Sequence, residues 1–138
     1  MHNQLIWPLF AMALLSSLVW LRLFQTRIGE MKRRQIHPQQ VATSVQTSLL
    51  EDTRAADNFR NLFELPVLFY LAILLAIHLN FENIILLLLA WAFVALRFLH
   101  SYIHCTYNRV MDRFRVYLIS GIMLWSFWVV LAYLFLIK

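Results

Sequence analysis

Residues 62–99, LFELPVLFYLAILLAIHLNFENIILLLLAWAFVALRFL, decide the fold. Two apolar runs, 62–79 and 83–99, flank a short polar turn, and each is interrupted by one charged residue, Glu64 or Arg97. A helix needs about 20 residues, within a tolerance of about 17–25, to cross a bilayer core of roughly 30 Å. Both runs meet this length, and their continuous, Leu-rich character favours helices over alternating strands. The segment therefore predicts a hairpin of two transmembrane helices.

Two further apolar runs flank this hairpin. Leu5–Leu21 contains no charge, and Val116–Ile137 contains no ionisable group apart from two tyrosines. Of the 138 residues, 62% are hydrophobic and 14% are charged, whereas soluble domains average about 45–50% and roughly 25%. The expected fold is therefore all-α, an integral membrane four-helix bundle in a single domain, residues 1–138. The expected helices cover about 5–35, 52–79, 82–107 and 112–137.

Proline and the basic residues refine this picture. Pro66 falls inside the second expected helix, so a kink and a freed carbonyl near Leu62 are expected there. All Lys and Arg residues except Lys138 surround two connections, the first-to-second and the third-to-fourth. The positive-inside rule places both connections in the cytoplasm and both termini outside. A basic rim at the membrane surface also explains the net charge of +5 without a nucleic-acid partner.

Four polar residues at helical spacing mark the inner end of the second expected helix: Asp57, Arg60, Asn61 and Glu64. The spacing places them on one helical face, and Arg60 and Glu64 stand four apart, as in an ion pair. Charge in a bilayer interior costs roughly 2.5–3.5 kcal/mol on insertion scales and is usually paired or faces a polar cavity. Two interpretations of Glu64 stay open. It forms a structural pair with Arg60 or an arginine of a neighbouring helix, or it binds the amino group of a ligand.

The third and fourth expected helices carry polar residues at the same depth. Arg97, His100 and His104 follow one another on the third, and Arg113 and Tyr117 stand four apart at the start of the fourth. The two histidines are spaced for a polar contact between helices. They would form a zinc site only with a third ligand, such as the carboxylate of the second helix. Three helices thus direct polar side chains to one level of the membrane.

Sequence motifs of soluble enzymes are missing from this chain. It has no zinc-protease motif, P-loop, dinucleotide fingerprint or nucleophile elbow. The single cysteine, Cys105, has no metal-ligand companion at a recognisable spacing, and we interpret it as a packing residue, with a reactive thiol as the alternative.

Three blocks resemble the MAPEG family, the membrane-associated proteins of eicosanoid and glutathione metabolism. RNLFELP (60–66) matches an Asn-x-x-Glu on the second helix followed by Pro. RFLHSYIH (97–104) is similar to the Arg-x-x-His-x-x-x-Tyr pattern of microsomal prostaglandin E synthase, and RFRVY (113–117) to an Arg with a Tyr four residues on. The resemblance covers essentially the whole chain, and the microsomal glutathione transferases belong to the same family.

The resemblance implies a homotrimer with glutathione, as co-substrate, bound between adjacent subunits and open toward the cytoplasm. Asn61 and Glu64 would hold the peptide part of glutathione, and Arg113 would lie near its sulfur as the catalytic residue. A nearby guanidinium lowers a thiol pKa and raises the thiolate fraction. An arginine of the first helix would also contact the tripeptide, either Arg27 or Arg34. The expected binding residues are Arg27, Arg60, Asn61, Glu64, Arg97, His100, His104 and Tyr117, and no metal is expected.

Three positions depart from the eicosanoid enzymes of the family. His104 replaces a Tyr, Phe114 replaces a hydroxyl residue, and Asp57 replaces an Arg. An acid at position 57 would repel a glutathione carboxylate. These departures resemble bacterial members, which implies an integral protein of the bacterial inner membrane.

The expected function is that of a membrane-bound glutathione-dependent transferase or peroxidase, which conjugates or reduces hydrophobic, lipid-derived electrophiles. The alternative is a non-catalytic membrane scaffold on the same fold that binds lipid or a partner protein. A small transporter subunit is a third interpretation, but neither an inverted repeat nor a pair of interrupted helices supports it.

Overall fold

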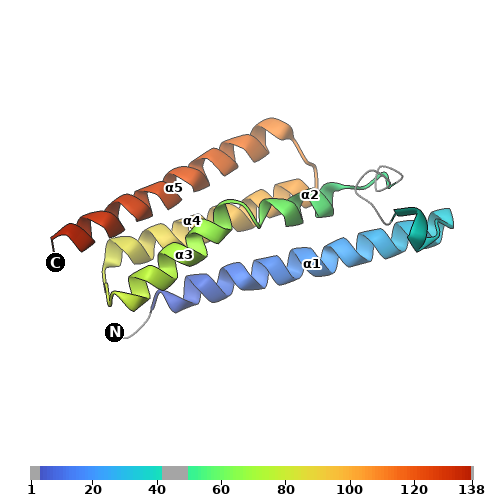
Figure 1. Cartoon of the computed structure of the whole chain (residues 1–138). Helices are drawn as coiled ribbons and strands as arrows, with labels where there is room; N and C mark the ends of the chain where they lie inside the picture. Colours follow the sequence, from blue (N-terminus) through green and yellow to red (C-terminus); the bar gives the residue numbers. More distant parts are fainter. Residues whose placement is uncertain (1–3, 42–49, 138) are drawn as a thin grey trace.

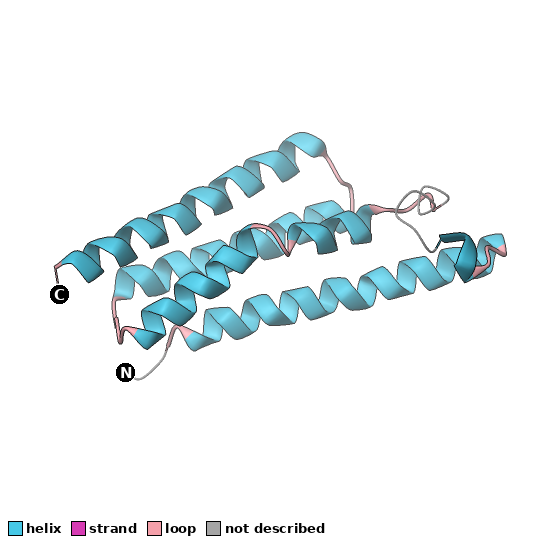
Figure 2. Ribbon diagram, in the orientation of Figure 1, coloured by secondary structure: helices cyan, strands magenta, loops and turns pink. Residues whose placement is uncertain are grey.

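The computed structural model describes residues 4–41 and 50–137, and in this part of the chain all regular structure is helical (Figures 1 and 2). Four helical stretches are long and apolar enough to cross a membrane: Ile6–Arg34, Arg54–His78, Ile84–Cys105 and Val110–Leu136. The expected all-α bundle of four membrane-spanning helices is thus confirmed. The elements are α1 (Ile6–Arg34), η1 (Pro38–Val41), α2 (Arg54–Asn61), α3 (Leu65–His78), α4 (Ile84–Cys105) and α5 (Val110–Leu136).

The helices run side by side, and α4 lies at the centre of their contacts. α4 packs against α5, α1 and α2, while α3 packs against α5 and α1. The start of α1, the end of α5 and the α3–α4 turn lie at one end of the bundle, and the α4–α5 connection lies toward the other (Figure 1). The apolar core includes Phe69 of α3 stacked on Phe93 of α4, with ring centroids 4.6 Å apart. Many large apolar side chains outside this core are exposed, as expected where lipid is the solvent.

The second membrane span is interrupted where a single kinked helix, 52–79, was expected. α2 ends at Asn61, residues 62–64 form a turn, and α3 begins at Leu65. Pro66 lies in the first turn of α3, where its missing N–H costs no intrahelical bond. In the turn, the Phe63 N–H donates to the Arg60 carbonyl at 3.0 Å. The expectation of one continuous helix is therefore corrected, because proline starts a new helix here instead of bending an existing one.

A covered carboxylate joins the end of α1 to the segment that leads into α2. Glu30 is 6% exposed. Its Oε1 accepts the Glu51 N–H at 2.7 Å, and its Oε2 accepts the Asp52 N–H at 3.3 Å. The Arg34 guanidinium donates to the same carboxylate at 3.1 Å and pairs with the Glu51 carboxylate at 3.4 Å. Glu30 thereby fixes where the chain re-enters the bundle.

A second polar link continues from this point to the end of α4. Arg54 Nε lies 2.9 Å from Asp52 Oδ1, and Arg54 Nη1 donates to the Thr106 carbonyl at 2.8 Å. The hydrogen bond from Arg54 holds the pKa of Asp52 below its usual value. The start of α2 is thus attached to α1 on one side and to α4 on the other.

Replacing Glu30 with Ala should lower the melting temperature of the protein in lipid nanodiscs. Two backbone N–H groups lose their acceptor, and the net loss per hydrogen bond is about 1 kcal/mol. Glu30→Gln keeps one acceptor oxygen, so its loss should be smaller. Lys32→Ala, on an exposed neighbour, is the control and should leave the melting temperature unchanged. Equal melting temperatures for Glu30→Ala and the control would contradict the role given to Glu30.

Candidate functional site

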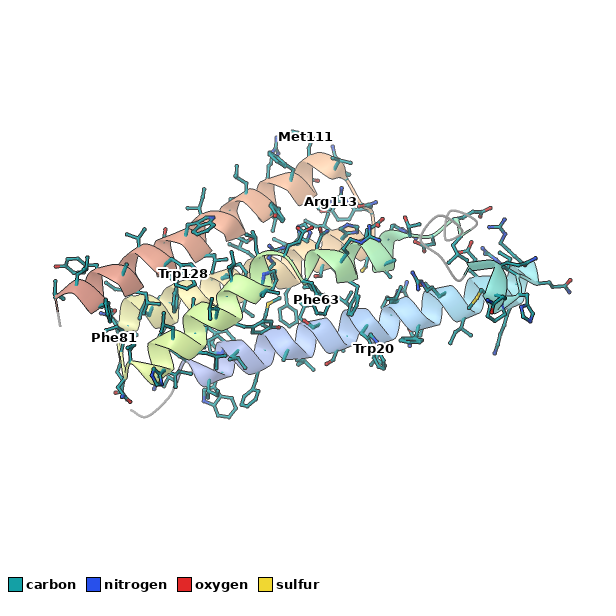
Figure 3. All side chains as sticks on the ribbon, viewed as in Figure 1. Trp20, Phe63, Phe81, Met111, Arg113 and Trp128 are labelled. Carbon is teal, nitrogen blue, oxygen red and sulfur yellow. The ribbon has the colours of Figure 1, made fainter. Side chains whose placement is uncertain are left out.

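The buried face of α4 changes from apolar to polar along its length. Leu86, Ala90 and Phe93 are buried in its first half, and Arg97 and His100 are buried in its second half. Their spacing of three or four residues keeps them all on one helical stripe. The polar half faces the start of α5 and the break between α2 and α3, where Figure 3 shows Arg113 and Phe63. The expected gathering of polar groups at one level is therefore present.

Arg97 is the most unusual member of this stripe. It is 0% exposed, and its guanidinium carbon lies 4.9 Å from the Tyr117 ring centroid and 5.4 Å from that of Phe93. None of its three guanidinium nitrogens has a hydrogen-bond partner among the residues that the structure describes. Cation–π contacts of this kind contribute up to about 2 kcal/mol. These contacts do not supply acceptors for the N–H groups. The guanidinium of Arg97 is therefore available to bind an anionic group, which the described residues do not provide.

Glu64 approaches this cation from the break between α2 and α3. Its side chain is exposed, and the Tyr117 hydroxyl donates to its Oε2 at 3.5 Å. Arg60 is also exposed, and in residues 4–41 and 50–137 it forms no ion pair with Glu64. Of the interpretations left open for Glu64, the pair with Arg60 is therefore not formed among the described residues, because α2 ends before Glu64 and the helical spacing no longer applies.

Arg113 links the start of α5 to the end of α4. Its Nη1 lies 3.1 Å from His104 Nε2 and donates to Asn108 Oδ1 at 2.9 Å. A guanidinium only donates, so His104 Nε2 must accept and Nδ1 must carry the proton. His100 Nδ1 lies 3.3 Å from the Arg113 carbonyl. Since a carbonyl only accepts, His100 Nδ1 donates. Two histidine tautomers are thus fixed by one arginine.

These tautomers leave two unused ring nitrogens in the site. His104 Nδ1 is a buried donor and His100 Nε2 a buried acceptor, and both lack a partner in the described part of the chain. The two rings are 5.8 Å apart, and the His100 ring lies 5.9 Å from that of Tyr117. The stripe therefore offers free hydrogen-bonding capacity of both kinds beside the unpartnered guanidinium of Arg97.

α2 contributes a residue that the sequence pattern did not single out. Asn58 is 0% exposed, and it contacts Ser101 and Cys105 of α4. Its neighbour Asp57 is half-buried and accepts a hydrogen bond from Thr53 at 2.9 Å. Spacing could have identified Asn58, because it lies three residues after Ala55 and four before Leu62, both of which are buried.

Of the two arginines of α1 considered for the site, Arg34 is occupied by Glu30 and Glu51. Arg27 is half-buried, and its Nε lacks a hydrogen-bond partner among the described residues. Of these two arginines, Arg27 is therefore the one with a nitrogen available to a ligand. The structure records no hydrogen bond or ion pair between Arg27 and the α4 residues within the described ranges.

A metal site or a cavity elsewhere in the bundle would be an alternative to this cluster. The described residues contain no group of three His, Cys, Asp or Glu side chains close enough to hold a metal ion. A small cavity of about 60 Å³ lies at the opposite end of the bundle, between the start of α1 and the α3–α4 turn. We place the candidate site at the polar cluster, because five of the seven buried side-chain atoms that lack a partner among the described residues belong to Arg97, His100 and His104.

Replacing Arg97 with Met should stabilise the ligand-free protein. The substitution removes a buried charge that has no acceptor and keeps much of the side-chain volume, and such exchanges stabilise by up to about 4 kcal/mol. The matched variant is Arg113→Met, which leaves His104 and Asn108 without their donor and should cost about 1–2 kcal/mol. Melting temperatures in nanodiscs provide the measurement. A lower melting temperature for Arg97→Met would show that a protein group already satisfies Arg97.

Comparison with known proteins gives one match. The model of the MAPEG family matches residues 5–133 of this chain. No curated protein and no solved structure matches it. The matched range includes all three blocks that carry the resemblance. It also includes all four membrane-spanning stretches, apart from the last residues of α5. The chain therefore belongs to the MAPEG family, the membrane-associated proteins of eicosanoid and glutathione metabolism.

Proposed function

We propose that this protein is a membrane-bound glutathione-dependent transferase or peroxidase that acts on hydrophobic, lipid-derived electrophiles. The observation that carries the proposal is the buried guanidinium of Arg97, which lacks acceptors among the described residues. A buried cation without a partner lowers the stability of the folded protein. It is retained most readily where a ligand carboxylate forms an ion pair with it. Membership of the MAPEG family supports a ligand of the glutathione-related class.

The charges of the site match those of glutathione. The tripeptide carries two carboxylates and one ammonium group. Arg97 and Arg27, with unpartnered nitrogens, suit the carboxylates, and the exposed carboxylate of Glu64 suits the ammonium group. Arg60 and Asn61 lie at the end of α2, shortly before Glu64, and would pack beside the peptide. His100, His104 and Tyr117 would complete the binding surface from α4 and α5.

Arg113 is the residue that we propose to act on the sulfur. Its guanidinium is held by His104 and Asn108, so it presents a fixed positive charge. A thiol with an ordinary pKa of about 8.5 is mostly protonated at neutral pH, and a nearby cation favours the thiolate. The thiolate then forms a bond from sulfur to the electrophilic carbon. In conjugation, the leaving group departs from that carbon with its electron pair. In peroxide reduction, the thiolate instead attacks one peroxide oxygen, the oxygen–oxygen bond breaks, and the other oxygen leaves as an alkoxide that takes up a proton. A second glutathione then reacts with the resulting sulfenic acid, which releases water and forms the disulfide.

The surroundings of the site suit an apolar second substrate. Phe63 in the helix break and Phe114 at the start of α5 are both exposed, so they would face lipid or a neighbouring subunit. An electrophile dissolved in the bilayer would reach the site from this side. We further propose a homotrimer in a bacterial inner membrane, with the glutathione sites between subunits. The basic connections, and with them the site, would face the cytoplasm.

A non-catalytic scaffold is the second candidate, and Asp57 favours it. This half-buried acid lies on α2 one turn before Asn61 and would repel a glutathione carboxylate. On this alternative, the unpartnered guanidinium of Arg97 would hold the acidic headgroup of a lipid. Glutathione binding separates the two candidates.

Reduced glutathione at millimolar concentration should raise the melting temperature of the purified protein, because a ligand that binds the folded state stabilises it by about 2.7 kcal/mol at 100 times its Kd. Glu64→Gln should fold with an unchanged ligand-free melting temperature and lose this increase. Free cysteine at the same concentration is the control for a general thiol effect. No increase with the wild-type protein would reject the glutathione-dependent function.

Arg113→Gln should lower the rate of conjugation of glutathione to 1-chloro-2,4-dinitrobenzene at neutral pH. Each unit by which the thiol pKa rises reduces the thiolate fraction about tenfold. The pH midpoint of the rate should therefore move upward, and activity should recover at alkaline pH, in assays run well below the melting temperature of the variant. Arg115→Gln, on the exposed side of the same helix turn, is the control. An unchanged pH midpoint in Arg113→Gln would remove this residue from the chemistry.

A further inference from the structure

One buried amide joins α2 to α4 at two points. Asn58 Oδ1 accepts a hydrogen bond from Ser101 Oγ at 3.2 Å, and Asn58 Nδ2 donates to Cys105 Sγ at 3.4 Å. Ser101 and Cys105 stand four residues apart, so the amide spans successive turns of α4. Asn58 is 0% exposed and Ser101 is 4% exposed. The contact is therefore shielded from solvent that could replace it.

This contact is adjacent to the candidate site on both helices. Asn58 precedes Asn61 by three residues on α2, and Ser101 follows Arg97 by four residues on α4. Each pair is about one helical turn apart, which is roughly 5.4 Å along the axis. A small rotation or sliding of α2 on α4 would therefore move Asn61, and the turn that carries Glu64, relative to Arg97.

A polar contact fixes such a register more strictly than an apolar one. Apolar side chains in a helix interface accept small shifts, because their attraction has no direction. A donor and an acceptor that meet two different turns of α4 are satisfied in one register only, and a shift leaves buried polar atoms without partners. α2 has only eight residues and ends in the interrupted part of the span. It has little apolar surface of its own with which to hold its position.

We propose that Asn58 is a positioning residue of the site, which holds α2 on α4 in the register that places Asn61 and Glu64 opposite Arg97. The Arg54 contact with the Thr106 carbonyl secures the start of α2, and Asn58 secures its middle. The anchoring itself is independent of the ligand. Its consequence for glutathione affinity rests on the function proposed above.

Hydrogen–deuterium exchange of the full-length protein in nanodiscs tests the anchoring. In Asn58→Leu, which keeps the side-chain volume but removes both hydrogen bonds, amides of α2 should exchange at least about fivefold faster, which is the factor expected from the loss of one net hydrogen bond alone. Ser101→Ala breaks the Ser101 contact and leaves the Cys105 contact, so it should give an increase in the same direction but smaller, and the double variant should add little to the increase in Asn58→Leu. Exchange in the first half of α3 should stay unchanged. Unchanged exchange in α2 for both single variants overturns the inference, whether or not glutathione binds.

Glutathione titration of the melting temperature tests the positioning role. In Asn58→Leu the apparent Kd for glutathione should rise about fivefold, because part of the binding energy must restore the register. The matched control is Ser16→Ala, which removes the Ser16–Tyr70 contact between α1 and α3, 3.5 Å long and away from the site. The control should keep the wild-type Kd.

The outcomes separate the two proposals. Faster exchange in α2 together with wild-type glutathione affinity would reduce Asn58 to a structural residue and overturn the positioning role. A wild-type protein that does not respond to glutathione rejects the proposed function, and the exchange of α2 then decides on Asn58 alone. If Asn58→Leu does not fold, both measurements are made on Ser101→Ala, since it breaks the Ser101 half of the contact with a smaller change in the side chain.

Discussion

A guanidinium buried without acceptors is the constraint around which the rest of the structure is organised. Arg97 lies on the central helix, fully covered, between the rings of Phe93 and Tyr117. Ionisable residues inside membrane-spanning helices are expensive and commonly mark functional sites. The aromatic rings lower the cost of burial, but they leave the directional capacity of the N–H groups unused. We interpret that capacity as the recognition site for a carboxylate.

The neighbouring elements fit this role. The interruption of the second span brings Glu64 next to Tyr117, and the Tyr117 ring covers the Arg97 guanidinium. Glu64 and Arg97 therefore lie at the same level of the bundle without forming an ion pair. Arg113 fixes both histidines in defined tautomers, which leaves one donor and one acceptor available. Asn58 links the short helix α2 to α4 close to this point. The burial of Arg97 without acceptors lowers the stability of the fold, and the polar contacts of Arg113 and Asn58 hold the side chains of the site in position.

Much of this arrangement could be predicted from the sequence, because it depends on local periodicity. The lengths of the apolar runs predict four spans, and the spacing of Arg97, His100 and His104 places them on one face of a helix that is in fact continuous. The face of the second span could not be predicted in the same way, because Pro66 starts a new helix and removes Glu64 from the register of Arg60. The role of Glu30 could not be predicted for another reason. Its partners are backbone N–H groups on the far side of a connection, and no spacing rule reports them.

The direct test of the account is a cryo-electron microscopy structure of the protein in lipid nanodiscs with reduced glutathione. If Arg97 recognises a carboxylate of glutathione, the tripeptide should appear with one carboxylate within hydrogen-bonding distance of the Arg97 guanidinium. When glutathione is omitted, the guanidinium should have no protein carboxylate as a partner. A structure in which Arg97 is paired with Glu64, or with a carboxylate of a neighbouring subunit, in both samples would contradict this role of Arg97.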